Sequence, residues 1–215
     1  MKNRFLHGVL IVLTGLSFGN AQELSKQSSV FFTTKAKDTL RINETFNEKD
    51  STSSKSLQNR LKPIQSNFKR INSMTKWTSV QKKNIEGESA EGGEATFYYT
   101  DKLLEKVIAR HYGEMGQVLI EYYLLNGELS FVFEKEYRYN RPLFYDAKAM
   151  KENNDTEAFD LKKSKIIMTR NYFEKGNIIL INTTTGHESN ISADYPAEQE
   201  KSITEDFKRL LKLAD

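Results

Sequence analysis

Alternating apolar and polar residues in the second half of the chain predict a series of β-strands. The runs are rich in aromatic and β-branched residues, which favour strands. Short turn signals separate them, and Asn126-Gly127 is the clearest, because a type I′ hairpin turn needs two positive φ angles. Short connections make neighbouring strands antiparallel. We therefore expect a meander of about six strands, at 95–100, 104–112, 117–125, 128–139, 164–173 and 178–182.

Helical spacing replaces this alternation on either side of the predicted meander. Five apolar residues are spaced 4, 3, 4 and 3 apart, which places them on one helix face: Leu57, Leu61, Ile64, Phe68 and Ile71. Pro63 lies within this run, so the helix either kinks there or begins there. A second helix follows Pro196, with acidic residues early and basic residues late, as the helix dipole favours. The predicted fold class is α+β, an antiparallel meander packed on one face by an N-terminal and a C-terminal helix.

The turns also predict which residues share a face of the sheet. A two-residue loop at Asn126-Gly127 places Leu124 opposite Leu129, and by the same count Tyr122 opposite Phe131 and Ile120 opposite Phe133. Across the turn at 113–116, the count places Val107 and Ala109 opposite Tyr122 and Ile120. These residues form the expected core face. The other face is expected to be half-solvated and to carry Arg110, Tyr112, Glu121, Tyr123 and Glu134.

The five residues on this open face are the candidate binding residues. Eight tyrosines fall between positions 98 and 145, and tyrosine offers apolar area with a polar tip, which suits recognition of a protein or a glycan. Strand propensity alone would also enrich tyrosine here. The leading hypothesis is a binding module whose partner is an envelope protein or glycan.

Two alternatives remain open beside the binding module. One is an envelope hydrolase that uses Glu121 and Glu134 as paired carboxylates, or His111 as a general base near Glu114. The other is a structural envelope protein without a ligand. We find no nucleophile elbow, no phosphate-binding glycine loop and no set of metal ligands in the sequence, so no cofactor or metal is predicted. The sequence does not establish a catalytic activity.

Composition narrows the classes of function. The chain has 32 basic and 29 acidic residues, interleaved rather than clustered, which argues against nucleic-acid binding. It contains no cysteine, which excludes a thiol nucleophile, a thiolate zinc site and disulfide exchange.

The start of the chain predicts export. Lys2 and Arg4 precede a mainly apolar run at 5–18, and Gly19 and Ala21 supply small residues at the expected cleavage site. The apolar run is shorter than the roughly 20 residues of a spanning helix. We expect residues 1–21 to be a signal peptide, 22–53 a flexible leader and 54–215 a single α+β domain with no membrane span. The product would be periplasmic or secreted, and its oligomeric state is open.

The segment 85–142 resembles a family of uncharacterised exported proteins of Bacteroidota. The resemblance lies in the runs IEGESAEGGEATFYY, KVIARHYGEMGQ and EYYLLNGELSFVFEKEYRYNRP. It implies an exported protein with an antiparallel β-meander. No activity is assigned to that family, so the resemblance implies no functional residue.

Overall fold

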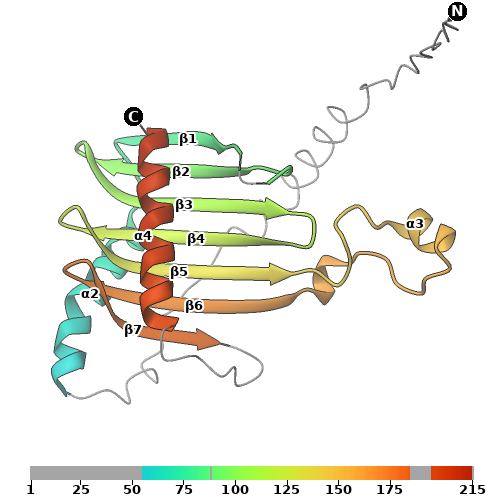
Figure 1. Ribbon diagram of the computed structural model, residues 1–215. Coiled ribbons are helices and arrows are strands. Elements are labelled where there is room, and N and C mark those ends of the chain that lie inside the picture. Colours follow the sequence, from blue (N-terminus) through green and yellow to red (C-terminus); the bar gives the residue numbers. More distant parts are fainter. Residues whose placement is uncertain (1–54, 88, 185–194, 215) are drawn as a thin grey trace, which may run out of the picture. The chain divides into compact units, whose positions relative to one another are not determined.

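The computed structural model describes residues 55–87, 89–184 and 195–214 (Figure 1). The expected signal peptide and leader lie outside these residues. In chain order the elements are α2 (Lys55–Ser73), β1 (Ser79–Ile85), β2 (Gly93–Thr100), β3 (Leu103–Gly113), β4 (Gly116–Leu125), β5 (Glu128–Arg138), α3 (Ala147–Glu152), the 3-10 helix η2 (Leu161–Lys163), β6 (Lys165–Glu174), β7 (Asn177–Thr184) and α4 (Tyr195–Ala214). None of the described helices is both long and apolar enough to span a membrane.

The strands form one antiparallel sheet in the order β1 to β7, which confirms the α+β meander. The sheet has seven strands rather than six, because β1 pairs with β2 at its edge. The sequence of β1, SVQKKNI, has apolar residues only at Val80 and Ile85, so it lacks the alternation that marks the other strands. Lysines on an edge strand hinder pairing with other chains. The Asn126-Gly127 turn has φ of 55° and 83°, as predicted.

Helix α4 packs across one face of the sheet, which we call the α4 face (Figure 1). Its buried residues Ile203, Phe207 and Leu210 join a core of small, branched and aromatic side chains from β1 to β6. The ring of Phe207 stacks on Tyr122 with centroids 5.2 Å apart. Burial of such side chains is the main favourable contribution to folding.

Helix α2 packs on the opposite face, which we call the α2 face. The ring of Phe68 lies 4.9 Å from Tyr123 and 5.3 Å from Phe131. Tyr122 and Tyr123 are consecutive in β4, so their side chains point to opposite sides of the sheet. The expectation that both helices pack on one face is therefore wrong. Each face carries its own apolar set, and each set is covered by its own helix, with Pro63 inside α2 rather than at its start.

A β-bulge in the β4–β5 hairpin determines which residues of β5 lie on each face. Leu124 pairs with Leu129 as predicted, but the register shifts between Tyr123 and Leu124. Beyond the shift, Tyr122 pairs with Val132, and Ile120 pairs with Glu134. A shift of one residue moves every later side chain to the other face. The predicted pairs of Tyr122 with Phe131 and of Ile120 with Phe133 are therefore wrong, whereas the predicted pairing of β3 with β4 is confirmed.

Candidate functional site

The bulge separates the five predicted binding residues into two groups. Arg110, Tyr112, Glu121 and Tyr123 lie on the α2 face, and Glu134 lies on the α4 face. The prediction that Glu121 and Glu134 share a face is wrong. Two carboxylates on opposite sides of a sheet cannot flank one scissile bond, so the hydrolase hypothesis loses its paired acids.

Glu121 and Tyr123 belong to a buried network beneath α2. The Lys106 Nζ atom lies 2.6 Å from the Glu121 carboxylate and donates a hydrogen bond of 2.8 Å to the Tyr123 hydroxyl. That hydroxyl donates in turn to Glu121, and Asn72 of α2 accepts from Lys106 at 3.3 Å. Glu121 is 6% exposed and Tyr123 is 1% exposed. These two side chains help to hold helix α2 on the sheet, and they are buried beneath it.

Glu134 has an equivalent role beneath α4. Its carboxylate accepts hydrogen bonds from Asn171 at 2.7 Å and from Gln199 of α4 at 2.5 Å. Burial raises the pKa of Glu134 to about 7, and the two amide donors partly oppose that rise. Two turns further along α4, Asp206 accepts a hydrogen bond from the Tyr122 hydroxyl.

His111 also lies on the α4 face. Its Nε2 atom lies 3.7 Å from the Asp206 carboxylate, and burial lowers its pKa. The expected neighbour Glu114 is instead exposed at the β3–β4 turn. The imidazole of His111 therefore lies between strand β3 and helix α4, close to the Asp206 carboxylate.

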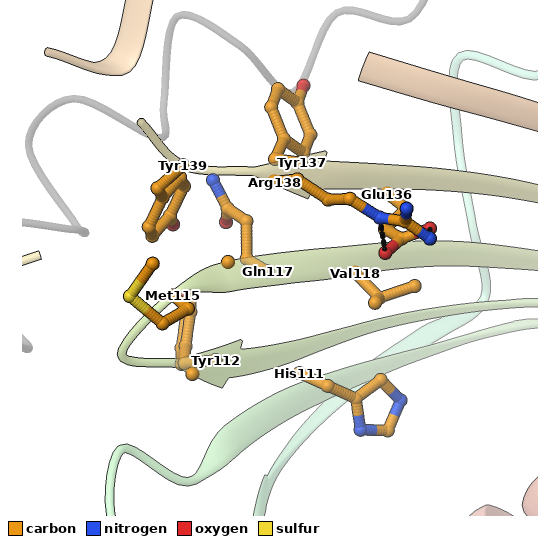
Figure 2. A pocket seen from close by; sticks show the side chains of 11 residues that line it. His111, Tyr112, Met115, Gln117, Val118, Glu136, Tyr137, Arg138 and Tyr139 are labelled. Atoms are coloured by element: carbon orange, nitrogen blue, oxygen red, sulfur yellow. Dashed lines mark hydrogen bonds and ion pairs between the residues drawn. The ribbon is translucent and has the colours of Figure 1, made fainter. Parts of the chain in front are cut away.

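A pocket of about 500 Å³ opens at the end of the sheet where β3 turns into β4; we call it the end pocket (Figure 2). This volume is within the usual range for ligand sites in proteins. The wall is mainly apolar and includes Met115, Val118 and three tyrosines, with Gln117 and His111 among its hydrogen-bonding residues. The residues that line it are His111, Tyr112, Gly113, Met115, Gly116, Gln117, Val118, Glu136, Tyr137, Arg138 and Tyr139.

Two glycines make this pocket possible. Gly113 and Gly116 pair across the turn, so no side chains fill the end of the β3–β4 hairpin. A Cβ atom on Gly116 would lie 2.4 Å from the carbonyl oxygen of Tyr137, which no real contact allows. Met115, at the tip of the turn, is 53% exposed. The chain leaving β5 borders the same turn, because the Tyr139 amide donates to the Met115 carbonyl at 2.9 Å.

Arg110 contacts the wall of this pocket through Gln117 and has an incomplete set of hydrogen-bond partners. Its Nη1 atom donates to the Gln117 side-chain oxygen at 2.6 Å, and the residue is 1% exposed. Its Nε and Nη2 atoms have no hydrogen-bond partner among the described residues. The charge of Arg110 acts on Tyr112 and Tyr139, both in the pocket wall, and burial raises the Tyr139 pKa to about 12 despite that charge. The Tyr139 hydroxyl is therefore a hydrogen-bond donor at neutral pH.

The site assembled by the structure overlaps only partly with the one predicted. Tyr112 lines it and Arg110 contacts its wall through Gln117, whereas Glu121, Tyr123 and Glu134 are not part of it. His111, the candidate general base, also lines the pocket, and Tyr137 and Tyr139 belong to the tyrosine cluster noted in the sequence, whereas sequence reasoning did not single out Met115, Gln117 or Val118. The signal that could have found them is an exposed methionine between two glycines at a hairpin tip, next to tyrosines on the following strand.

No group of three metal-ligating side chains occurs in the part of the chain that the structure describes. Comparisons of the chain with protein-family models, with curated proteins and with solved structures found no match.

Proposed function

We propose that this chain is an exported binding protein whose end pocket receives an extended segment of a partner protein. The observation that carries the proposal is the end pocket itself, a mainly apolar hollow of about 500 Å³ with exposed Met115 at its rim. This refines the earlier hypothesis of recognition by an aromatic sheet face, because the centres of both faces are occupied by helices α2 and α4.

The chemistry of the wall favours a peptide over a glycan. Methionine is flexible and polarisable, so it adapts to different apolar side chains, and tyrosine rings provide rigid contact area. A glycan presents many hydroxyl groups and would need many polar partners. Of the uncharged side chains in the wall, only Gln117, His111 and the tyrosines can supply them. Export is supported by the signal-peptide pattern in residues 1–21.

Methyl NMR of the methionines provides a direct test. The chain has five methionines, and Met74, Met150 and Met168 lie outside the wall of the end pocket and act as internal controls. On titration with a library of short peptides that vary in their apolar residues, we expect shifts at Met115 and none at those three. Saccharides are titrated in parallel. If no peptide in the library changes the chemical shift of the Met115 methyl group, the proposal is refuted. It is also refuted if only saccharides change that shift.

A pair of variants adds a matched control. Met115→Glu places a charge at the pocket rim, whereas Leu103→Glu places the same charge at the β2–β3 turn, where Leu103 is 66% exposed. We expect Met115→Glu to abolish peptide binding and Leu103→Glu to leave it unchanged. Equal loss in both variants would mean that binding depends on net charge and not on the pocket.

A further inference from the structure

We propose that the end pocket binds the C-terminal carboxylate of its peptide, with Arg110 as the buried counter-charge and with Gln117 and Tyr139 as hydrogen-bond donors. This inference rests on the proposed function and names the chemical group that is recognised. It assigns a role to a cation for which the fold alone gives no explanation.

The first argument is the state of Arg110. A charge removed from water costs several kcal/mol unless it is paired and hydrogen-bonded. Glu94 lies opposite Arg110 in the β2–β3 register, but its carboxylate hydrogen-bonds with Tyr112. Arg110 forms one hydrogen bond, to neutral Gln117, and its two other nitrogen positions are buried without a partner among the described residues. A buried group in this condition needs an explanation, and an anionic ligand supplies one.

The second argument is the orientation of Gln117. Because Arg110 donates to its oxygen, the amide nitrogen of Gln117 is left to donate elsewhere. Figure 2 shows this nitrogen directed to the side of Tyr137 and Tyr139. The buried Tyr139 hydroxyl has no hydrogen-bond partner among the described residues. One corner of the pocket therefore offers donors backed by a positive charge, the combination that binds a carboxylate.

The remaining charged groups of the wall do not cancel this preference. Glu136 and Arg138 pair with each other through hydrogen bonds of 2.6 Å and 3.1 Å. His111 has a lowered pKa because it is buried, which favours its neutral form at neutral pH. Arg110 is therefore the charge that sets the preference of this corner.

A peptide terminus fits the whole pocket better than an isolated anion does. The last residue of a peptide combines a carboxylate with a side chain, and on the face of the sheet that carries Gln117 the wall combines a donor corner with the apolar surfaces of Met115 and Tyr112. Capture of a terminal carboxylate is an established mode of peptide recognition. The pocket is open to solvent, so the rest of the peptide can leave it.

The test compares peptides that differ only at the C-terminus. Short peptides ending in Leu, Phe or Val are made as free acids and as amides, and a third set consists of amides with an internal Asp. Their affinities for the full-length exported protein are measured by calorimetry. We expect the free acids to bind about 10- to 100-fold more tightly than both amide sets, the range of one charge-assisted interaction.

Variants identify the residues responsible. Arg110→Met removes the charge and keeps most of the volume, and Tyr139→Phe removes one donor and keeps the ring. The matched control is Tyr137→Phe, because the Tyr137 hydroxyl is also buried without a partner among the described residues but points away from Gln117 in Figure 2. We expect Arg110→Met to reduce the preference for acid over amide to less than about threefold. Tyr139→Phe should reduce it partly, and Tyr137→Phe not at all. Urea unfolding of each variant confirms that it is folded.

The outcomes separate this inference from the proposed function. If acids and amides bind equally well at the end pocket, the proposed function stands and the carboxylate assignment is wrong. Equal affinity for the free acids and the internal-Asp amides would overturn the assignment to a terminus. Unchanged acid preference in folded Arg110→Met would overturn the role of Arg110. If no peptide of any set binds, both proposals fail.

Discussion

Glu134 offers a quantitative test of how α4 is held on the sheet. Its pKa of about 7 in the folded protein lies above the ordinary value of 4.5. Between these two values the folded state retains a proton that the unfolded state releases. The free energy of unfolding therefore falls as pH rises through this window. The contribution of Glu134 to stability is greatest below pH 4.5.

The magnitude follows from the size of the shift. A difference of 2.5 pKa units, from 4.5 to about 7, corresponds to about 3 kcal/mol at 1.36 kcal/mol per unit. Glu134→Gln cannot ionise and keeps a carbonyl oxygen as acceptor for Asn171 or Gln199. We expect the variant to gain up to about 3 kcal/mol relative to the wild type between pH 4.5 and pH 8, with most of the gain between pH 5 and pH 7.

Urea unfolding followed by tryptophan fluorescence provides the assay. Trp77 is the only tryptophan in the chain, and it packs against Tyr98 of β2 with centroids 5.2 Å apart. Unfolding of the sheet should therefore change its emission. The neutral control is Thr169→Val, because Thr169 is buried directly opposite Glu134 and does not titrate in this range. Its effect on stability should be the same at every pH.

One result would refute this reasoning. If the difference in unfolding free energy between Glu134→Gln and the wild type varied by less than about 0.5 kcal/mol over the whole range, Glu134 would not titrate from a buried position. The packing of α4 over β5 would then need another description.

Two further predictions concern the framework of the fold. Lys106→Met leaves the Glu121 carboxylate buried without its cation, so the free energy of unfolding should fall by about 3 kcal/mol. The double variant Lys106→Met with Glu121→Leu should recover most of this loss. If the losses of the two single variants simply add in the double variant, the network is contradicted. Gly116→Ala should destabilise the protein by about 2 kcal/mol, because the added Cβ atom would clash with the Tyr137 carbonyl oxygen. A melting temperature equal to that of the wild type would contradict this close approach.

Much of the fold could be predicted because its signals are local. The six expected strands and both long helices are encoded by periodicity, and the Asn126-Gly127 turn is encoded by its φ requirement. Strand β1 could not be found because its pairing with β2, not its own composition, makes it a strand. The β4–β5 bulge could not be found either. It leaves the turn and the pair Leu124–Leu129 unchanged, so the turn signal is the same with or without it.

The same bulge limited prediction of the site. It moved Glu134 away from Glu121, and α2 covered Tyr123, so three of the five candidate residues became parts of the framework. Arg110 and Tyr112 kept their expected face because the β3–β4 register was correct. The end pocket depends on contacts between the turn and the chain beyond β5, such as that of Tyr139 with Met115, which sequence spacing does not encode.

The most direct test of the account is a crystal structure of the protein with a short peptide that ends in leucine and has a free carboxylate. The account predicts the leucine side chain against Met115 and Tyr112, on the same face of the sheet as Gln117. It places the carboxylate within hydrogen-bond distance, about 3 Å, of the Gln117 amide nitrogen and the Tyr139 hydroxyl. A peptide bound along the outer edge of β1 or β7, with the end pocket unchanged, would contradict it.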